Sequence, residues 1–244
     1  MRIEKKFRRL SLVIMGLFLV IAFSCVKNSS QPSFVATSDV DGNSYNTVNI
    51  GTQVWMVENL NTTRFQNGDT IPMVTDNAKW ATLTTPAQCY FQNVPPYLGA
   101  YGRLYNWYVL NDPRGLAPTG WHVATYNDYM TLEAYVAAYP NASYSVAQLL
   151  ADNIDWTPIL NTVGNVGSNL ASNNLSGFSA LPAGYRSASG NFSSLFLGSN
   201  GNFWCATEYN STDGWGRSLS SNKSTFDKNN FKKTYGFSVR CVHD

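Results

Sequence analysis

The two histidines are the first residues to consider for chemistry, because imidazole is the commonest metal ligand and general base near neutral pH. His122 and His243 each stand alone, with no second histidine four residues away and no nearby pair of cysteines. This spacing does not predict a zinc site, and it favours a packed or surface role for His122. The sequence also lacks a G-x-S-x-G elbow, a Walker loop and an H-E-x-x-H helix. We therefore expect no catalytic residue, no metal and no cofactor.

The four cysteines divide into one near the N-terminus and three in the rest of the chain. Cys25 follows an apolar run and one serine, Ser24, where a lipid-modified cysteine would lie. Cys89, Cys205 and Cys241 remain, an odd number for the oxidising compartment that a signal peptide leads to. A bridge between Cys205 and Cys241 would join two neighbouring strands, and the residues alone leave this pairing open.

The acidic stretch Asp39, Asp41 and Asn43 has the D-x-D-x-N spacing that begins a calcium loop. Its glycine is at position 42 instead of 44, and Ile50 occupies the place of the bidentate glutamate. Asp41-Gly42 is instead typical of a hairpin turn, so we expect a turn and no calcium.

A candidate ligand-binding surface lies in TEYNSTDGWGR, residues 207–217, a polar loop between two predicted strands. Aromatic faces can stack on sugars, and arginine with carboxylates can bind hydroxyls or peptides. The alternative is that the tryptophan begins a core strand and the charges are merely solvated. The predicted binding residues are Glu208, Tyr209, Asp213, Trp215 and Arg217.

Two helices are predicted to position these loops. Within residues 99–121, Leu104, Trp107, Tyr108 and Asn111 follow the i, i+3, i+4, i+7 pattern of one helical face, which ends at Asp112-Pro113. The second helix begins after an N-cap at Thr125, with Asp128 completing a capping box, and ends at Pro140. Its apolar stripe is formed by Tyr129, Leu132, Val136 and Tyr139.

Strands are predicted on both sides of the helices. Residues 45–50 and 53–58 form an antiparallel pair around Gly51-Thr52. Residues 73–98 are irregular, 145–151 add one or two helical turns, and 153–176 form a long loop. Short strands follow, the last of which alternates Phe237, Val239 and Cys241 on one face. These strands are predicted at 178–181, 184–186, 203–207, 215–219 and 235–242.

The N-terminus is typical of a bacterial lipoprotein. A basic segment at 1–9 precedes an apolar run at 10–23, and Ser24-Cys25 follows as in a lipobox. We expect a signal peptide at 1–24, lipid attachment at Cys25, a flexible tether at 25–38 and a folded domain at 39–244. An ordinary signal peptide with an incidental cysteine is the alternative.

The composition limits the partners. The chain is 44% hydrophobic and only 13% charged, which suffices for a sizeable core. The signal segment holds five of the 17 basic residues and one of the 15 acidic residues, so the mature chain has 12 basic and 14 acidic residues and a net charge of −2, close to neutral. It therefore lacks the basic face that nucleic acid requires, and we expect no nucleic-acid partner.

Four ordered blocks together resemble a known family: DVDGNSYNTVNIGTQVWMVENLNTTRFQNGDTIP, GAYGRLYNWYVLNDPRGLAPTGW, GFSALPAGYRSASGNFSS and YGFSVRCV. They are similar to the Fibrobacter succinogenes major paralogous domain, a module of bacterial lipoproteins whose molecular function is largely unassigned. The resemblance implies an α+β, C-type-lectin-like fold, with two principal helices packed on short twisted antiparallel sheets and long loops. It also implies a disulfide between Cys89 and Cys241, because the family usually has cysteines at these positions, and leaves Cys205 as a small buried residue.

The resemblance implies a non-catalytic module on the bacterial cell envelope, anchored to the outer membrane through the N-terminal lipid and binding a glycan or protein ligand. The sequence does not show which face of that membrane it occupies, because an acidic cluster after Cys25 is missing. Calcium-dependent sugar binding is not implied, since the Glu-Pro-Asn and Trp-Asn-Asp motifs are absent. One alternative is a structural or assembly subunit of a surface complex such as a fimbrial tip. A less favoured one is an oxidase like the formylglycine-generating enzymes, which share the scaffold and hold copper with two thiols but whose active-site motif is not matched.

Overall fold

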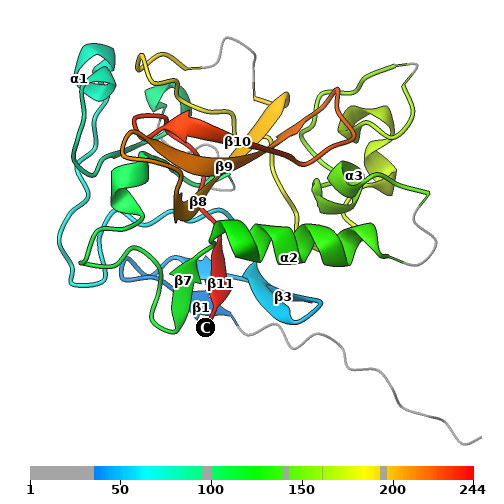
Figure 1. Cartoon of the computed structure of the whole chain (residues 1–244), viewed down its shortest axis with the longest axis horizontal. Coiled ribbons are helices and arrows are strands. Elements are labelled where there is room, and N and C mark those ends of the chain that lie inside the picture. Colours follow the sequence, from blue (N-terminus) through cyan, green and yellow to red (C-terminus); the bar gives the residue numbers. More distant parts are fainter. Residues whose placement is uncertain (1–35, 95–100, 140–142, 161, 193–196) are drawn as a thin grey trace, which may run out of the picture. The chain divides into compact units, whose positions relative to one another are not determined.

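A computed structural model describes residues 36–94, 101–139, 143–160, 162–192 and 197–244 (Figure 1). The chain divides into two units, Met1–Gln31 and Pro32–Asp244, and every described residue belongs to the second. The predicted signal peptide and Cys25 lie outside the described residues. The folded unit is an α+β domain with few helices and several small antiparallel sheets.

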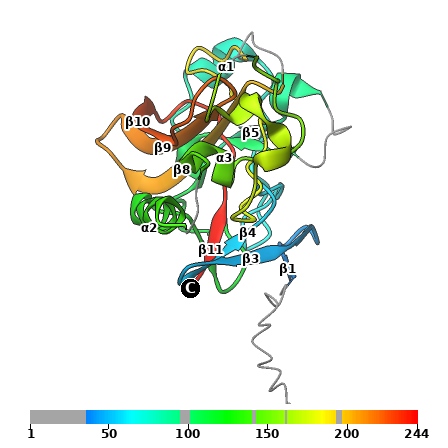
Figure 2. The ribbon, with the colours of Figure 1, turned by 90° about the vertical axis from the view of Figure 1, so that its right-hand side faces the viewer.

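A four-stranded sheet joins the two ends of this unit. The C-terminal strand β11 lies between β4 and β7 and is antiparallel to both. Figure 2 shows β4 beside β11, with β3 beyond it. The tight turn between β3 and β4 has Gly51 at a φ of 64°, a conformation that favours glycine. The strands in spatial order are β3 Thr47–Ile50, β4 Gln53–Met56, β11 Cys241–His243 and β7 Trp121–Val123.

A three-stranded antiparallel meander forms the second sheet, in the order β10-β9-β8. Its strands are β8 Asn200–Glu208, β9 Asp213–Ser220 and β10 Asp227–Lys232. Two small ladders pair β1 with β2 and β5 with β6. These short strands are β1 Thr37–Ser38, β2 Ser44–Tyr45, β5 Gln88–Cys89 and β6 Leu104–Tyr105.

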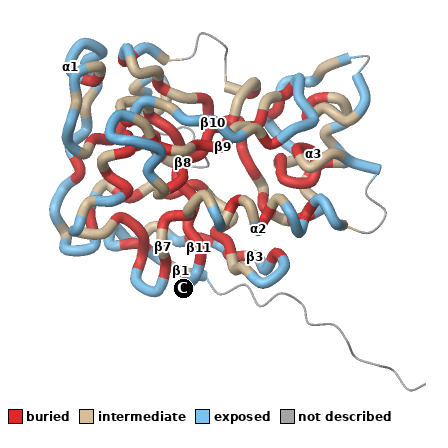
Figure 3. The backbone as a smooth tube through the Cα atoms, viewed as in Figure 1, coloured by how far each residue is buried: buried red, intermediate tan, exposed pale blue. Residues whose placement is uncertain are grey.

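The long helix α2, Tyr126–Ala137, packs between these two sheets (Figure 1). It begins as predicted, because the Thr125 side chain accepts from the Asp128 backbone while the Asp128 carboxylate accepts from the Thr125 backbone. Its buried stripe, Tyr129, Leu132 and Val136, was also predicted. Figure 3 shows buried, intermediate and exposed residues alternating along α2.

The remaining helices are short. Helix α3, Val146–Leu150, confirms the predicted one or two turns, whereas α1, Asn77–Ala81, falls in a stretch predicted to be irregular. Four single turns of 3-10 helix complete the described elements: η1 Phe91–Asn93, η3 Trp107–Val109, η4 Val166–Ser168 and η5 Leu170–Ser172.

The first of the two predicted principal helices is wrong. Its apolar residues instead form strand β6 and the turn η3. The backbone N–H groups of Tyr105, Asn106 and Trp107 donate to distant carbonyls, those of Phe237, Ala87 and Lys233. Aromatic residues, asparagine and valine have modest helix propensity, so these long-range hydrogen bonds outweigh the local 3.6-residue pattern.

The strand predictions were right where hairpins are local. The pairs around Gly42 and Gly51 are confirmed, and the alternation of Phe237, Val239 and Cys241 places all three in one core cluster. The runs at 178–181 and 184–186 form only isolated bridges, and β10 was not predicted. Strand β1 also lies inside the stretch predicted to be a tether, so the folded domain begins before Asp39.

Three fully buried arginines hold the loops between these small elements. Arg186 donates to the backbone carbonyls of Gly190, Val74 and Thr75, and its guanidinium lies 4.3 Å from the ring centre of Trp80. Arg217 and Arg240 make comparable sets of contacts beneath α2 and between the sheets. Hydrogen bonds from these buried arginines connect loop segments that no strand pairing joins.

Candidate functional site

Two of the five predicted binding residues lie together at the surface of the β8–β9 hairpin. Tyr209 is 48% exposed, and its ring meets the Trp215 ring edge-on with centroids 4.8 Å apart. Trp215 is half-buried and also contacts Tyr126, at 4.9 Å between centroids. We call Tyr126, Tyr209 and Trp215 the aromatic patch. It lies where the N-terminus of α2 meets the hairpin.

Arg217 was predicted to bind ligand at the surface, and this prediction is wrong. Its side chain has no exposed surface, and Nη2 lies 2.6 Å from Glu133 Oε2 and 2.8 Å from the Phe226 carbonyl oxygen. The guanidinium also covers the Phe226 ring at 4.2 Å. Alternation along β9 places Arg217 on the same face as Trp215 but further beneath α2, where it belongs to the core.

The two predicted carboxylates are already engaged within the protein. Glu208 forms an ion pair with the buried Lys233, whose ammonium lies 4.6 Å from the centre of the Trp107 ring. Asp213 accepts a 2.7 Å hydrogen bond from Asn230 Nδ2. The structure therefore brings Tyr209 and Trp215 together as an accessible pair and does not gather the three charged residues around them.

The prediction of a disulfide between Cys89 and Cys241 is wrong. Cys89, Cys205 and Cys241 are three free, buried thiols, each in a different hydrophobic cluster. Cys89 lies on β5, Cys205 on β8 and Cys241 on β11, so no two of them are register neighbours. Burial raises the pKa of Cys89 to about 11 and that of Cys205 to about 12, and raises the pKa of Cys241 further.

His122 lies between two carboxylates at the start of α2. Its Nδ1 is 2.7 Å from Asp244 Oδ1, and its Nε2 is 3.2 Å from Asp128 Oδ2. Asp128 also accepts hydrogen bonds from Thr125, so His122 connects the C-terminal residue to the cap of α2. Among the residues with assigned positions, no group of three or more His, Cys, Asp or Glu side chains is arranged to hold a metal ion.

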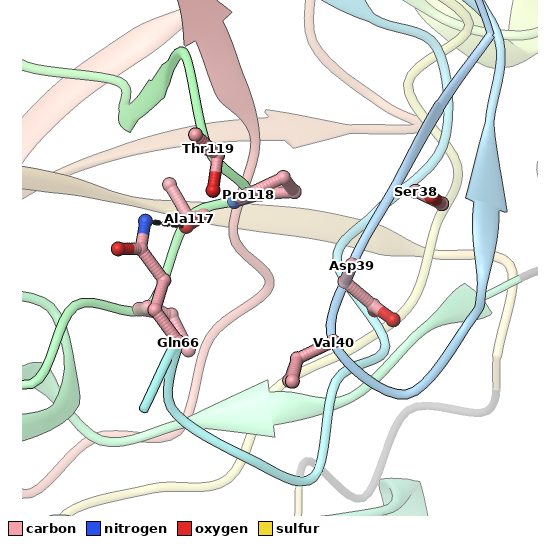
Figure 4. A pocket seen from close by; sticks show the side chains of 8 residues that line it. Ser38, Asp39, Val40, Gln66, Ala117, Pro118 and Thr119 are labelled. Carbon is pink, nitrogen blue, oxygen red and sulfur yellow. Dashed lines mark hydrogen bonds between the residues drawn. The ribbon is translucent and has the colours of Figure 1, made fainter. Parts of the chain in front are cut away.

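The Asp39 segment is a turn, as predicted. Asp39 accepts from the backbone N–H groups of Asp41 and Asn43 and from the Tyr45 hydroxyl, while Asp41 accepts from Thr63. A hollow of about 220 Å³ lies beside Asp39 (Figure 4). Its opposite side is formed by the 117–119 turn and by Gln66, whose amide donates to the Ala117 carbonyl. Because Asp39 already receives several protein donors, its oxygens are not free for a cation.

Sequence reasoning missed another cavity, of about 250 Å³, on the face of the three-stranded sheet that points away from α2. It depends on β10, which carries no strong apolar alternation and was not predicted as a strand. The one available signal was the density of aromatic residues in 231–237. Its lining residues are Tyr185, Asn202, Ser218, Lys223, Asp227, Asn229, Phe231, Tyr235 and Phe237.

This arrangement defines an α+β domain built from small antiparallel sheets around one long helix. The family model of the Fibrobacter succinogenes major domain matches residues 48–243, and the chain belongs to this family, as the four sequence blocks predicted. No curated protein and no solved structure matches the chain. Within the described part of the chain, no helix has the length and apolar character needed to cross a membrane.

Proposed function

We propose that this protein is a non-catalytic lipoprotein of the bacterial cell envelope, with a C-type-lectin-like domain that binds a glycan or protein ligand through the aromatic patch. The observation that carries the proposal is the exposure of Tyr209, whose ring stands on Trp215 with 48% of the residue accessible. Tyrosine and tryptophan are favoured at recognition surfaces because they bury large areas with few rotatable bonds.

The chemistry of the patch indicates what kind of contact it makes. Arg217 is buried, and Glu208 and Asp213 are paired with protein groups, so charge contributes little at the surface. Stacking and apolar contact remain. The expected ligand therefore offers a flat apolar face, which either a sugar ring or a protein side chain can supply.

The decisive variant is Tyr209→Ala, because this side chain is exposed and its removal leaves the core intact. We expect wild-type protein to be captured on a glycan or peptide array without calcium, and Tyr209→Ala to bind at least about tenfold more weakly. Melting temperature should stay close to that of the wild type. Trp215→Ala is a poorer test, because Trp215 packs against the main core cluster.

Tyr135→Ala is a matched control. Tyr135 is 46% exposed and meets Tyr139 edge-on at 5.6 Å, but it lies near the other end of α2. It should retain capture. Equal capture by the wild type and Tyr209→Ala would contradict the proposed site, and an array with no captured spot would favour the structural-subunit alternative.

Copper oxidase chemistry is disfavoured by the state of the thiols. Copper binds thiolates, yet Cys205 and Cys241 lie in different core clusters and burial raises the pKa of both. The non-catalytic proposal is therefore preferred over the oxidase alternative.

We further propose that a lipid on Cys25 anchors the protein to the bacterial outer membrane. The support is the order of basic segment, apolar run, small residue and cysteine at 1–25. Cells grown with a labelled fatty acid should label the wild-type protein and not Cys25→Ala. Equal labelling of the two would remove the lipid anchor from the proposal.

A further inference from the structure

The face of the three-stranded sheet that points away from α2 carries a row of polar side chains. Register pairs Asn202 on β8 with Ser218 on β9, and Ser218 with Asp227 on β10, so all three share one face. Arg217 and Phe203 belong to the opposite face, where Arg217 meets Glu133 of α2. The row therefore forms one side of the 250 Å³ cavity and is separate from the aromatic patch.

Asn202 has an unused hydrogen-bond donor in this cavity. The residue is only 6% exposed, and its Nδ2 atom is buried with no hydrogen-bond partner among the described residues. A buried amide donor without a partner costs free energy, because it has lost its hydrogen bonds to water. Native proteins rarely retain such a group without a reason, and a ligand acceptor would satisfy it.

Aromatic rings also line the cavity. The Phe231 ring lies 5.5 Å from that of Tyr235 and 4.8 Å from that of Phe237, and Tyr185 lies 6.2 Å from Tyr235. Gly216 leaves room for this arrangement, because a Cβ atom at that position would lie 3.0 Å from the Phe231 ring. The lining of the cavity therefore combines flat apolar faces with polar atoms.

The charges at the cavity compensate one another. Lys223 Nζ lies 2.5 Å from Asp227 Oδ2, and Thr225 donates to Asp227 Oδ1 at 2.6 Å. Burial works towards a higher pKa for Asp227, but these hydrogen bonds outweigh it and hold the pKa below its usual value. Asp227 is thus an ionised acceptor with its own cation, and the cavity does not select a charged ligand.

From these observations we propose that this cavity binds one neutral saccharide ring, held by the aromatic rings and the polar row of Asn202, Ser218 and Asp227. The apolar C–H face of a sugar packs on aromatic rings, and its hydroxyls can both accept from Asn202 Nδ2 and donate to Asp227. The volume of about 250 Å³ is below the 300–1,000 Å³ range of drug-sized sites and suits a single ring. The ring could be a free monosaccharide or the end of a longer glycan. The site does not depend on the aromatic patch.

The test is saturation-transfer NMR of the full mature chain with a panel of neutral monosaccharides and their methyl glycosides: glucose, galactose, mannose, fucose, xylose and rhamnose. At least one should bind at millimolar concentration, and Asn202→Ala should weaken its binding about tenfold. Asn202→Ala should melt at or above the wild-type temperature, because it removes an unpaired buried amide. A purely structural role for Asn202 would lower that temperature instead.

Adjacent asparagines on β10 provide a matched pair of variants. Asn229 lines the cavity. Asn230 is the register partner of Trp215, and both lie on the opposite face of the sheet. Asn229→Ala should weaken sugar binding and Asn230→Ala should not; if Asn202→Ala fails to fold, this pair decides. Tyr209→Ala should bind the sugar normally, which separates this site from the aromatic patch. Preference for a methyl glycoside over the free sugar would identify a glycan end as the natural source.

The proposal is overturned if no neutral sugar in the panel binds the wild type. It is also overturned if a bound sugar is retained equally by Asn202→Ala and Asn229→Ala.

Discussion

An Arg240→Met protein should be less stable than the wild type by roughly 3–5 kcal/mol, enough to unfold many domains of this size. Arg240 is fully buried and donates to Asn59 Oδ1 at 2.7 Å and to the carbonyls of Met56 and Phe178 at 2.9 Å. A fourth bond reaches the Ser179 carbonyl at 2.8 Å. These acceptors come from segments that no regular strand pairing connects.

The size of the effect follows from what methionine leaves behind. It fills much of the space but donates no hydrogen bond, so several buried acceptors lose their partner at a cost of about 1 kcal/mol or more each. Burial lowers the pKa of Arg240 to about 10, because the surrounding core disfavours the charged guanidinium.

Urea unfolding followed by circular dichroism measures this loss directly. Arg64→Ala is the control, because Arg64 is half-exposed and pairs with Asp41 at 3.3 Å on the surface. Surface pairs typically contribute about 1 kcal/mol or less. An Arg240→Met midpoint equal to that of the control would show that the carbonyls are satisfied without the guanidinium.

Arg217→Ala should also destabilise the domain, by roughly 2–4 kcal/mol, and should reduce ligand capture only through that loss of stability. Its guanidinium has no exposed surface, whereas the partner Glu133 is 30% exposed and can be rehydrated once the arginine is removed. The loss should therefore be smaller than for Arg240. One nitrogen, Nε, has no hydrogen-bond partner within the described part of the chain, which further limits what the residue contributes.

A double-mutant cycle with Glu133→Gln tests this interpretation. We expect a coupling free energy of about 1–3 kcal/mol between the two positions, measured by urea unfolding. Capture by Arg217→Ala should recover when the assay is cooled to a temperature at which the variant is folded. Persistent loss of capture in a folded Arg217→Ala protein would mean that the guanidinium reaches the ligand after all.

The sequence by itself determined those features that depend on neighbours along the chain. Thr125 and Asp128 are three residues apart, so their reciprocal cap and the stripe of α2 could be predicted from local spacing. The hairpins at Gly42 and Gly51 are equally local, because only glycine readily adopts their φ of 83° and 64°. The four ordered blocks were enough to identify the family.

Tertiary structure decided the features that depend on distant partners. The predicted helix at 104–111 was replaced by pairing with Phe237 and Ala87, and no local pattern encodes those hydrogen bonds. Arg217 resembles a surface residue in sequence, but alternation along β9 and the position of α2 place it in the core. The same holds for the cavity beside Asn202, whose polar row exists only because three strands align in one register. The sequence specifies the chemical groups of each side chain, but packing between segments far apart in the chain sets its exposure and its partners.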